Sequence, residues 1–187
     1  MPMPDYYLLI VVLLLLFAIG DLIVGVSNDA VNFLNSAIGS KAAPRKVIMW
    51  VASIGIFAGA AFSGGMMEVA RKGIFNPSFF VFAEVMIIFV AVMLTDIVLL
   101  DVFNTFGLPT STTVSLVFEL LGASVAIGLV KIIQNGHSLA LLANYINASN
   151  VTSIVSGIFL SVLFAFVFGA VVQYFSRLLF TFNFKYK

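Results

Sequence analysis

The chain has no cysteine and a single histidine among its 187 residues. The lack of cysteine excludes disulfide bonds, and one histidine cannot supply the usual zinc-binding patterns. No nucleophile occurs in a pattern with a base and an orienting group, so we do not expect an enzyme. The formal net charge is only +1, and no basic patch indicates a nucleic-acid partner.

Charge of either sign is also scarce, since charged residues make up 9% of the sequence and about 25% is usual in soluble domains. Hydrophobic residues make up 62%, and the mean hydropathy is +1.18. A chain of this composition cannot cover itself with a polar surface, which predicts an integral protein of the lipid bilayer. Its N-terminal apolar run lacks the basic flank and the small-residue cleavage site of a signal peptide, so we expect a transmembrane helix there.

The predicted fold class is an all-α integral membrane protein, a single membrane domain over residues 1–187 with about five transmembrane helices. A helix that spans the bilayer needs about 20 mostly apolar residues. The segments that satisfy this requirement cover residues 6–26, 47–67, 79–100, 114–133 and 151–180. Two polar segments, residues 27–40 and 104–113, interrupt the pattern, and we expect both to be broken or re-entrant stretches.

Basic residues predict the orientation of the chain, because cytoplasmic loops are enriched in lysine and arginine. With five spans, one side of the membrane carries six basic residues and the other side carries three. The larger group is Lys41, Arg45, Lys46, Arg177, Lys185 and Lys187, and the smaller group is Arg71, Lys72 and Lys131. We therefore expect the N-terminus outside and the C-terminus in the cytoplasm, with the chain in the plasma or inner cell membrane.

The first polar segment, residues 27–40, is rich in asparagine and serine and follows a long apolar run. Polar groups at membrane depth must be satisfied within the protein, so such a segment is a candidate binding site. We expect Asn28 and Asp29 to cap a short helix on which Asp29, Asn32 and Ser36 share a face. Carboxylate and amide oxygens suit Na⁺, whereas amide donors suit an oxyanion. The alternative is an ordinary polar loop at the membrane edge.

The second polar segment, residues 104–113, contains signals that end one helix and start the next. Pro109 removes a backbone donor and Gly107 permits unusual dihedral angles, so both favour a break. Thr110 or Ser111 is expected to be the N-cap of the following helix. Free amide groups and the helix dipole would make this helix N-terminus an anion site.

Three motifs, in this order, resemble those of the inorganic phosphate transporter (PiT) family. The first is matched by Asn28, Asp29, Asn32, Ser36, Gly39 and Ser40. Residues 71–74 read Arg-Lys-Gly-Ile, as in the second motif, and residues 107–113 are similar to the Gly-Leu-Pro-Val-Ser-Thr-Thr motif. The chain departs from the family at Asn35, Val114 and Glu119, where the family often has glycine, histidine and a small residue. These departures leave the coupling ion open.

The resemblance implies secondary transport of inorganic phosphate coupled to a cation, with Na⁺ favoured over H⁺. It implies that the phosphate site consists of Asn28, Asn32, Thr110, Ser111, Thr112 and Thr113. The expected Na⁺ ligands are Asp29, Asn28, Asn32 and Ser36, and further site residues are Asp101, Asn104 and Glu119.

Members of this family are built from two halves of inverted topology, each with one copy of the motif set. This chain holds one set, and no second Asn-Asp-x-x-Asn pattern follows residue 146. It therefore resembles an N-terminal half, whose expected partner is a second half or a further copy of itself. Two alternatives stay open, namely transport of another oxyanion such as sulfate and a non-transporting membrane half that serves assembly.

Overall fold

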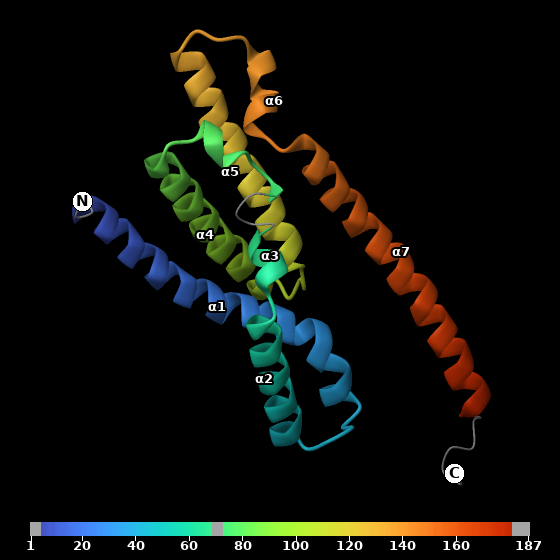
Figure 1. Cartoon of the computed structure of the whole chain (residues 1–187). Coiled ribbons are helices and arrows are strands. Elements are labelled where there is room, and N and C mark those ends of the chain that lie inside the picture. The colour runs from blue at the N-terminus through green and yellow to red at the C-terminus, as the bar shows by residue number, and fades with distance from the viewer. Residues whose placement is uncertain (1–4, 69–72, 181–187) are drawn as a thin grey trace. The chain divides into compact units, whose positions relative to one another are not determined.

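The computed structural model describes residues 5–68 and 73–180, and in these ranges the regular structure is helical. The elements are α1 (Asp5–Gly39), α2 (Arg45–Ala61), α3 (Gly64–Glu68), η2 (Pro77–Phe79), α4 (Phe82–Thr105), α5 (Thr112–Gln134), η3 (Leu139–Leu141), α6 (Leu142–Tyr145) and α7 (Ala148–Leu179) (Figure 1). Within these ranges, β-type pairing is limited to an isolated bridge between Phe75 and Ile146. The predicted all-α class is confirmed.

Among the described residues, four helices are long and apolar enough to cross a membrane, as expected for a multi-pass membrane protein. These candidate spans are Tyr6–Ala30, Phe82–Thr105, Thr112–Gln134 and Ala148–Leu179. The second expected span differs, because α2 has 17 residues and ends at Ala61, before a turn that leads into α3. Its length lies at the lower end of the range of about 17–25 residues found in bilayer-spanning helices.

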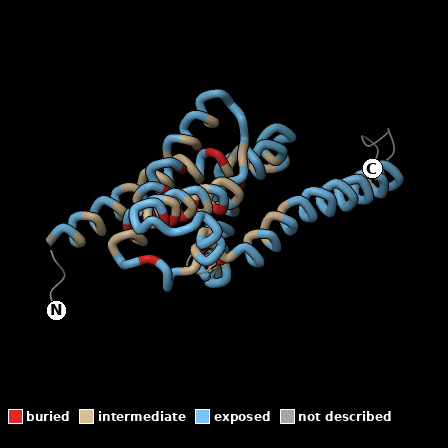
Figure 2. The backbone as a smooth tube through the Cα atoms, turned by 90° about the horizontal axis from the view of Figure 1, so that it is seen from above, coloured by how far each residue is buried: buried red, intermediate tan, exposed pale blue. Residues whose placement is uncertain are grey.

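The chain divides into two compact units, residues 1–148 and 149–187. The second unit holds nearly all of α7, a helix of 32 residues in which no residue is buried. In the first unit, α4 packs between α1 and α5, and α2 contacts α1 (Figure 1). The buried positions gather in the middle of this first unit, whereas α7 is mostly exposed, with a few positions of intermediate burial (Figure 2).

The core of the first unit is built from rows of residues spaced four apart on α4 and α5. The row on α4 is Ile88, Val92, Asp96 and Leu100, and the row on α5 is Leu120, Ser124, Gly128 and Ile132. Residues four apart lie on one helix face and form the ridges that pack between neighbouring helices. The small residues on α5 allow close approach, since a Cβ atom at Gly128 would lie 3.2 Å from Leu142 Cδ1.

Polar contacts connect the end of α5 to the start of α4. Lys131 Nζ donates to the Phe79 carbonyl and to Glu84 Oε2, both at 2.9 Å, so the end of α5 is tied to the start of α4. Glu84 also accepts from the Val81 backbone N–H at 2.8 Å, as expected for a carboxylate in the first turn of a helix.

Four of the basic residues used to predict orientation lie outside the described residues. They are Arg71, Lys72, Lys185 and Lys187. The orientation of the termini therefore stays a prediction. Ile74, the last residue of the second motif, is buried together with Phe75, and the Ile74 carbonyl accepts from the Asn147 N–H at 3.0 Å.

Candidate functional site

The first polar segment does not interrupt its helix, which differs from the expected break. Helix α1 continues through residues 27–39 without a gap and ends at Gly39, after 35 residues. Figure 1 shows that it changes direction in its second half. Asn28 and Asp29 are therefore in the interior of a helix instead of at its cap. The physical reason is that their side chains bind groups on α4 and α5, so they do not compete for the backbone of α1.

The second polar segment is a true break between helices, as predicted. Helix α4 ends at Thr105 and α5 begins at Thr112. Gly107 has φ 66°, a left-handed conformation that favours glycine. Of the two candidate N-caps, Ser111 takes the role, because its side-chain oxygen accepts from the Val114 N–H at 3.4 Å.

Asn28 joins the two polar segments. Its Nδ2 donates to Asn104 Oδ1 at 2.9 Å, and its Oδ1 accepts from the Thr110 backbone N–H at 3.1 Å. Asn104 Nδ2 in turn donates to the Val24 carbonyl at 3.1 Å. Asn28 is only 1% exposed, and both polar atoms of its amide have protein partners. In this arrangement its side chain positions the α4–α5 connection against α1.

Two further contacts extend this contact region along α1. Asn32 Nδ2 donates to the Thr110 carbonyl at 3.0 Å, and Thr112 Oγ1 donates to Asp29 Oδ2 at 3.4 Å. We call the set of contacting residues the polar junction; its members are Asn28, Asp29, Asn32, Asn104, Thr110 and Thr112. The structure thus brings together six of the residues that the sequence analysis assigned to a site.

The other predicted site residues lie around the polar junction or apart from it. Ser111 and Thr113 are exposed at the first turn of α5, and Ser36 is exposed one turn beyond Asn32. Asp101 is exposed near the end of α4. Glu119 is two turns into α5, where its Oε1 accepts from Ser115 Oγ at 2.7 Å.

The sequence leaves the roles of Asp21 and Asp96 open, and the structure places these two residues in contact with one another. Asp96 on α4 lies within hydrogen-bonding reach of Asp21 on α1 and of Glu119 on α5. A signal was present in the sequence. Asp21 precedes Asn28 by two helical turns, and an ionisable residue inside a membrane span is by default a candidate for function.

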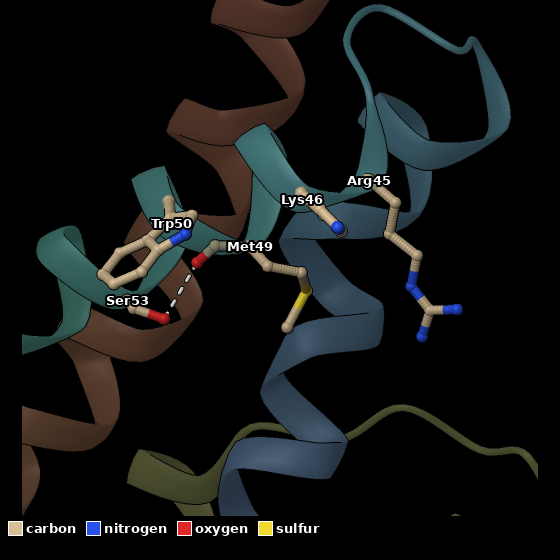
Figure 3. Close-up of a pocket in the computed structure, with 5 residues that line it drawn as sticks. All are labelled: Arg45, Lys46, Met49, Trp50 and Ser53. Carbon is tan, nitrogen blue, oxygen red and sulfur yellow. Dashed lines mark hydrogen bonds between the residues drawn. The ribbon is translucent and has the colours of Figure 1, made fainter.

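Two pockets differ in their relation to the polar junction. A small cavity of about 60 Å³ is lined by Asn28, Phe103, Asn104, Gly107, Leu108 and Pro109. A larger pocket of about 530 Å³ lies along one face of α2 and is lined by Arg45, Lys46, Met49, Trp50 and Ser53 (Figure 3). It shares no lining residue with the polar junction.

In the ranges that the structure describes, no group of three acidic, histidine or cysteine side chains is arranged to hold a metal ion.

Comparison with known proteins gives a consistent result. The family model described as the phosphate transporter family matches residues 25–186, a range that contains all three motifs. A protein of Thermococcus kodakarensis is 32% identical over 122 residues, which cover 64% of this chain and 30% of the relative. A protein of Pyrococcus furiosus is 30% identical over 175 residues, which cover 90% of this chain and 40% of the relative. Both carry the name "putative phosphate permease".

The chain spans well under half the length of these curated relatives. No solved structure matches the chain. The family match extends over most of the sequence and includes both polar segments that meet in the structure. The chain therefore belongs to the phosphate transporter family.

Proposed function

We propose that this chain forms one half of a secondary transporter that moves inorganic phosphate across a cell membrane together with a cation. Membership of the phosphate transporter family supports the substrate, and the relatives carry permease names. The observation that carries the proposal is the polar junction, in which residues 76 to 83 positions apart in sequence meet between apolar helices.

The proposed phosphate site is the N-terminal turn of α5. Amide groups at a helix N-terminus point along the axis, and the helix dipole favours an anion there. Ser111 and Thr113 expose hydroxyl groups at this turn, and Asn32 lies beside it through its bond to Thr110. Asn28 would act mainly by holding the α4–α5 connection in place, because its amide is already bonded to Asn104 and Thr110.

A cation is proposed because a phosphate ion is costly to place in a low-dielectric interior without compensation. Asp29 is the first candidate ligand, since its carboxylate is 3.4 Å from Thr112 Oγ1 and so lies beside the start of α5. Asn28, Asn32 and Ser36 on the same helix are the further candidates. A Na⁺ ion there would stand next to the anion and offset its charge.

The single motif set of this chain supports the proposed role as one half of a transporter. The exposed hydroxyl groups of Ser111 and Thr113 would face the second half, or a further copy of this chain. The proposed orientation has the N-terminus outside and the C-terminus in the cytoplasm. This requires an odd number of crossings, so α2 with its 17 residues would be the fifth.

Uptake of radiolabelled phosphate into proteoliposomes tests the proposal. The chain is reconstituted alone and together with the remainder of the transporter, with and without a Na⁺ gradient, and with excess sulfate as competitor. We expect gradient-dependent uptake that sulfate does not inhibit. Uptake by neither preparation contradicts transport and favours a role in assembly, whereas equal inhibition by sulfate contradicts phosphate selectivity.

A further inference from the structure

Three buried carboxyl oxygens are left without a hydrogen-bond partner in the part of the chain that the structure describes. They are Asp21 Oδ1, Asp96 Oδ1 and Glu119 Oε2, and no other buried side-chain nitrogen or oxygen of the described residues shares this property. Asp96 is 5% exposed and belongs to the buried row of α4. Buried polar atoms are almost always bonded, so an unpartnered one calls for a ligand or a function.

The three side chains come from different helices and meet at Asp96. Asp96 lies within hydrogen-bonding reach of Asp21 on α1 and of Glu119 on α5. A further carboxyl group, that of Asp29 on α1, interacts electrostatically with Asp96. The charged groups that act on Asp21 and Glu119 are likewise carboxyl groups.

Ionised carboxylates are acceptors only, so two of them at hydrogen-bonding distance cannot satisfy each other. Like charges in a dry interior also disfavour the ionised form of one partner. A proton placed between the two oxygens removes both problems, because the protonated group donates to the ionised one. Ser115 supplies one donor, but it bonds to Glu119 Oε1 and leaves Oε2 unpartnered.

We propose that Asp21, Asp96 and Glu119 form a proton-binding carboxyl cluster between α1, α4 and α5. Protons shared between Asp21 and Asp96 and between Asp96 and Glu119 supply the hydrogen-bond donors that these side chains lack. The proposed ligand is a proton, because a shared proton supplies the donor that is missing between two carboxyl groups. The cluster takes up a proton when a carboxylate becomes a carboxylic acid and releases the same proton in the reverse step.

The position of the carboxyl cluster links it to the polar junction. Asp21 precedes Asn28 by two turns on α1, and Glu119 follows Ser111 by two turns on α5. A change of charge in the cluster therefore acts on the same helices that carry the proposed phosphate site. This step rests on the proposed function: the cluster is the site of a coupling proton, in addition to any Na⁺ beside Asp29.

Infrared spectroscopy of the purified chain in lipid, recorded as a function of pH, tests proton binding directly. Protonated carboxyl groups have a C=O stretch that is distinct from the bands of carboxylates. We expect this band at neutral pH in the wild type and its loss in Asp96→Asn and Glu119→Gln. The matched control is Glu84→Gln, which removes a carboxylate paired with Lys131 at 2.9 Å and should leave the band unchanged.

Three results would overturn the proposal. The first is a wild-type spectrum without this band at neutral pH, and the second is a band that both cluster variants retain. The third is a band that Na⁺ removes at constant pH, which would make the cluster a sodium site. The wild-type spectrum alone can refute proton binding, because the band must be present at neutral pH. The proposal therefore stays testable even if a variant fails to fold.

A second measurement separates this proposal from the proposed function. Phosphate uptake and internal acidification are followed together in proteoliposomes that contain a pH-sensitive dye. For the same phosphate uptake, we expect the wild type to carry more protons into the lumen than Glu119→Gln, since the protons of the phosphate ion itself enter in both cases. If the infrared band depends on Asp96 and Glu119 but no phosphate is taken up, the proposed function fails and the proton-binding cluster stands.

Discussion

Asn28 and Asn104 are 76 residues apart in sequence, yet Asn28 Nδ2 donates to Asn104 Oδ1 at 2.9 Å. Through this pair the polar segment of α1 is attached to the break between α4 and α5. The same amide accepts from the Thr110 N–H, so one side chain satisfies groups on both sides of the break. Together with Asn32 and Asp29, Asn28 thus positions the N-terminus of α5 relative to α1.

Asn28→Ala should destabilise the fold. The change leaves Asn104 Oδ1 and the Thr110 N–H without their partners, and a buried unsatisfied group costs about 1–3 kcal/mol. Thermal unfolding of the protein in detergent measures the effect. The matched control is Asn35→Ala on the same helix, where the side chain is exposed and the expected change is within about 0.5 kcal/mol. Equal stability of the two variants would contradict the role given to Asn28.

Asp29→Asn should abolish cation-coupled phosphate uptake while the fold is kept. The change removes the negative charge proposed to hold the cation, but the amide oxygen can still accept from Thr112 Oγ1. Uptake in proteoliposomes with and without a Na⁺ gradient measures the effect. Ser27→Ala serves as control, since Ser27 is exposed and its hydroxyl donates to the Ile23 carbonyl of its own helix. Wild-type uptake with unchanged ion dependence in Asp29→Asn would refute the assignment.

Two substitutions of Ser111 separate helix capping from anion binding. Ser111→Ala removes the N-cap and should cost about 1 kcal/mol, because the Val114 N–H loses its side-chain acceptor. Ser111→Asp keeps a good N-cap, so stability should stay close to that of the wild type. Its negative charge would repel phosphate, and uptake should be lost. Normal uptake by Ser111→Asp would place the anion elsewhere.

Gly128→Ala should destabilise the first unit although alanine is the better helix former. A Cβ atom there would lie 3.2 Å from Leu142 Cδ1 and 3.3 Å from Tyr145 Cγ, so these side chains of α6 must shift. Overpacking of this kind costs about 1–3 kcal/mol. Gly122→Ala on the same helix has open space and should gain about 0.5–1 kcal/mol. Unfolding measurements that rank the two variants in the opposite order would show that α6 does not pack closely on α5.

The features that the sequence predicted depend on local signals. Gly107 and Pro109 mark the end of α4, and Ser111 is a typical N-cap, so the break at residues 104–113 could be placed from composition and spacing. The apolar helices follow from hydrophobicity over about 20 residues. The resemblance of three short motifs identified the family, and the family match confirms it.

The features that the sequence did not predict depend on contacts between distant residues. Helix α1 continues through its polar segment because Asn28 finds partners on α4 and on the α4–α5 connection. Helix α2 ends earlier than its hydrophobic pattern indicated, at a turn after Ala61. The carboxyl cluster could not be recognised, since Asp21, Asp96 and Glu119 meet only when three helices pack together.

The bonds of Lys131 have a consequence for motion within the first unit. Helices α4 and α5 are joined at one end by the short connection that contains Gly107 and Pro109, and at the other end by Lys131 with Glu84 and Phe79. A helical hairpin closed at both ends resists splaying. We therefore expect α4 and α5 to move as one rigid body, so that the conformational changes of transport take place where other helices slide along this hairpin.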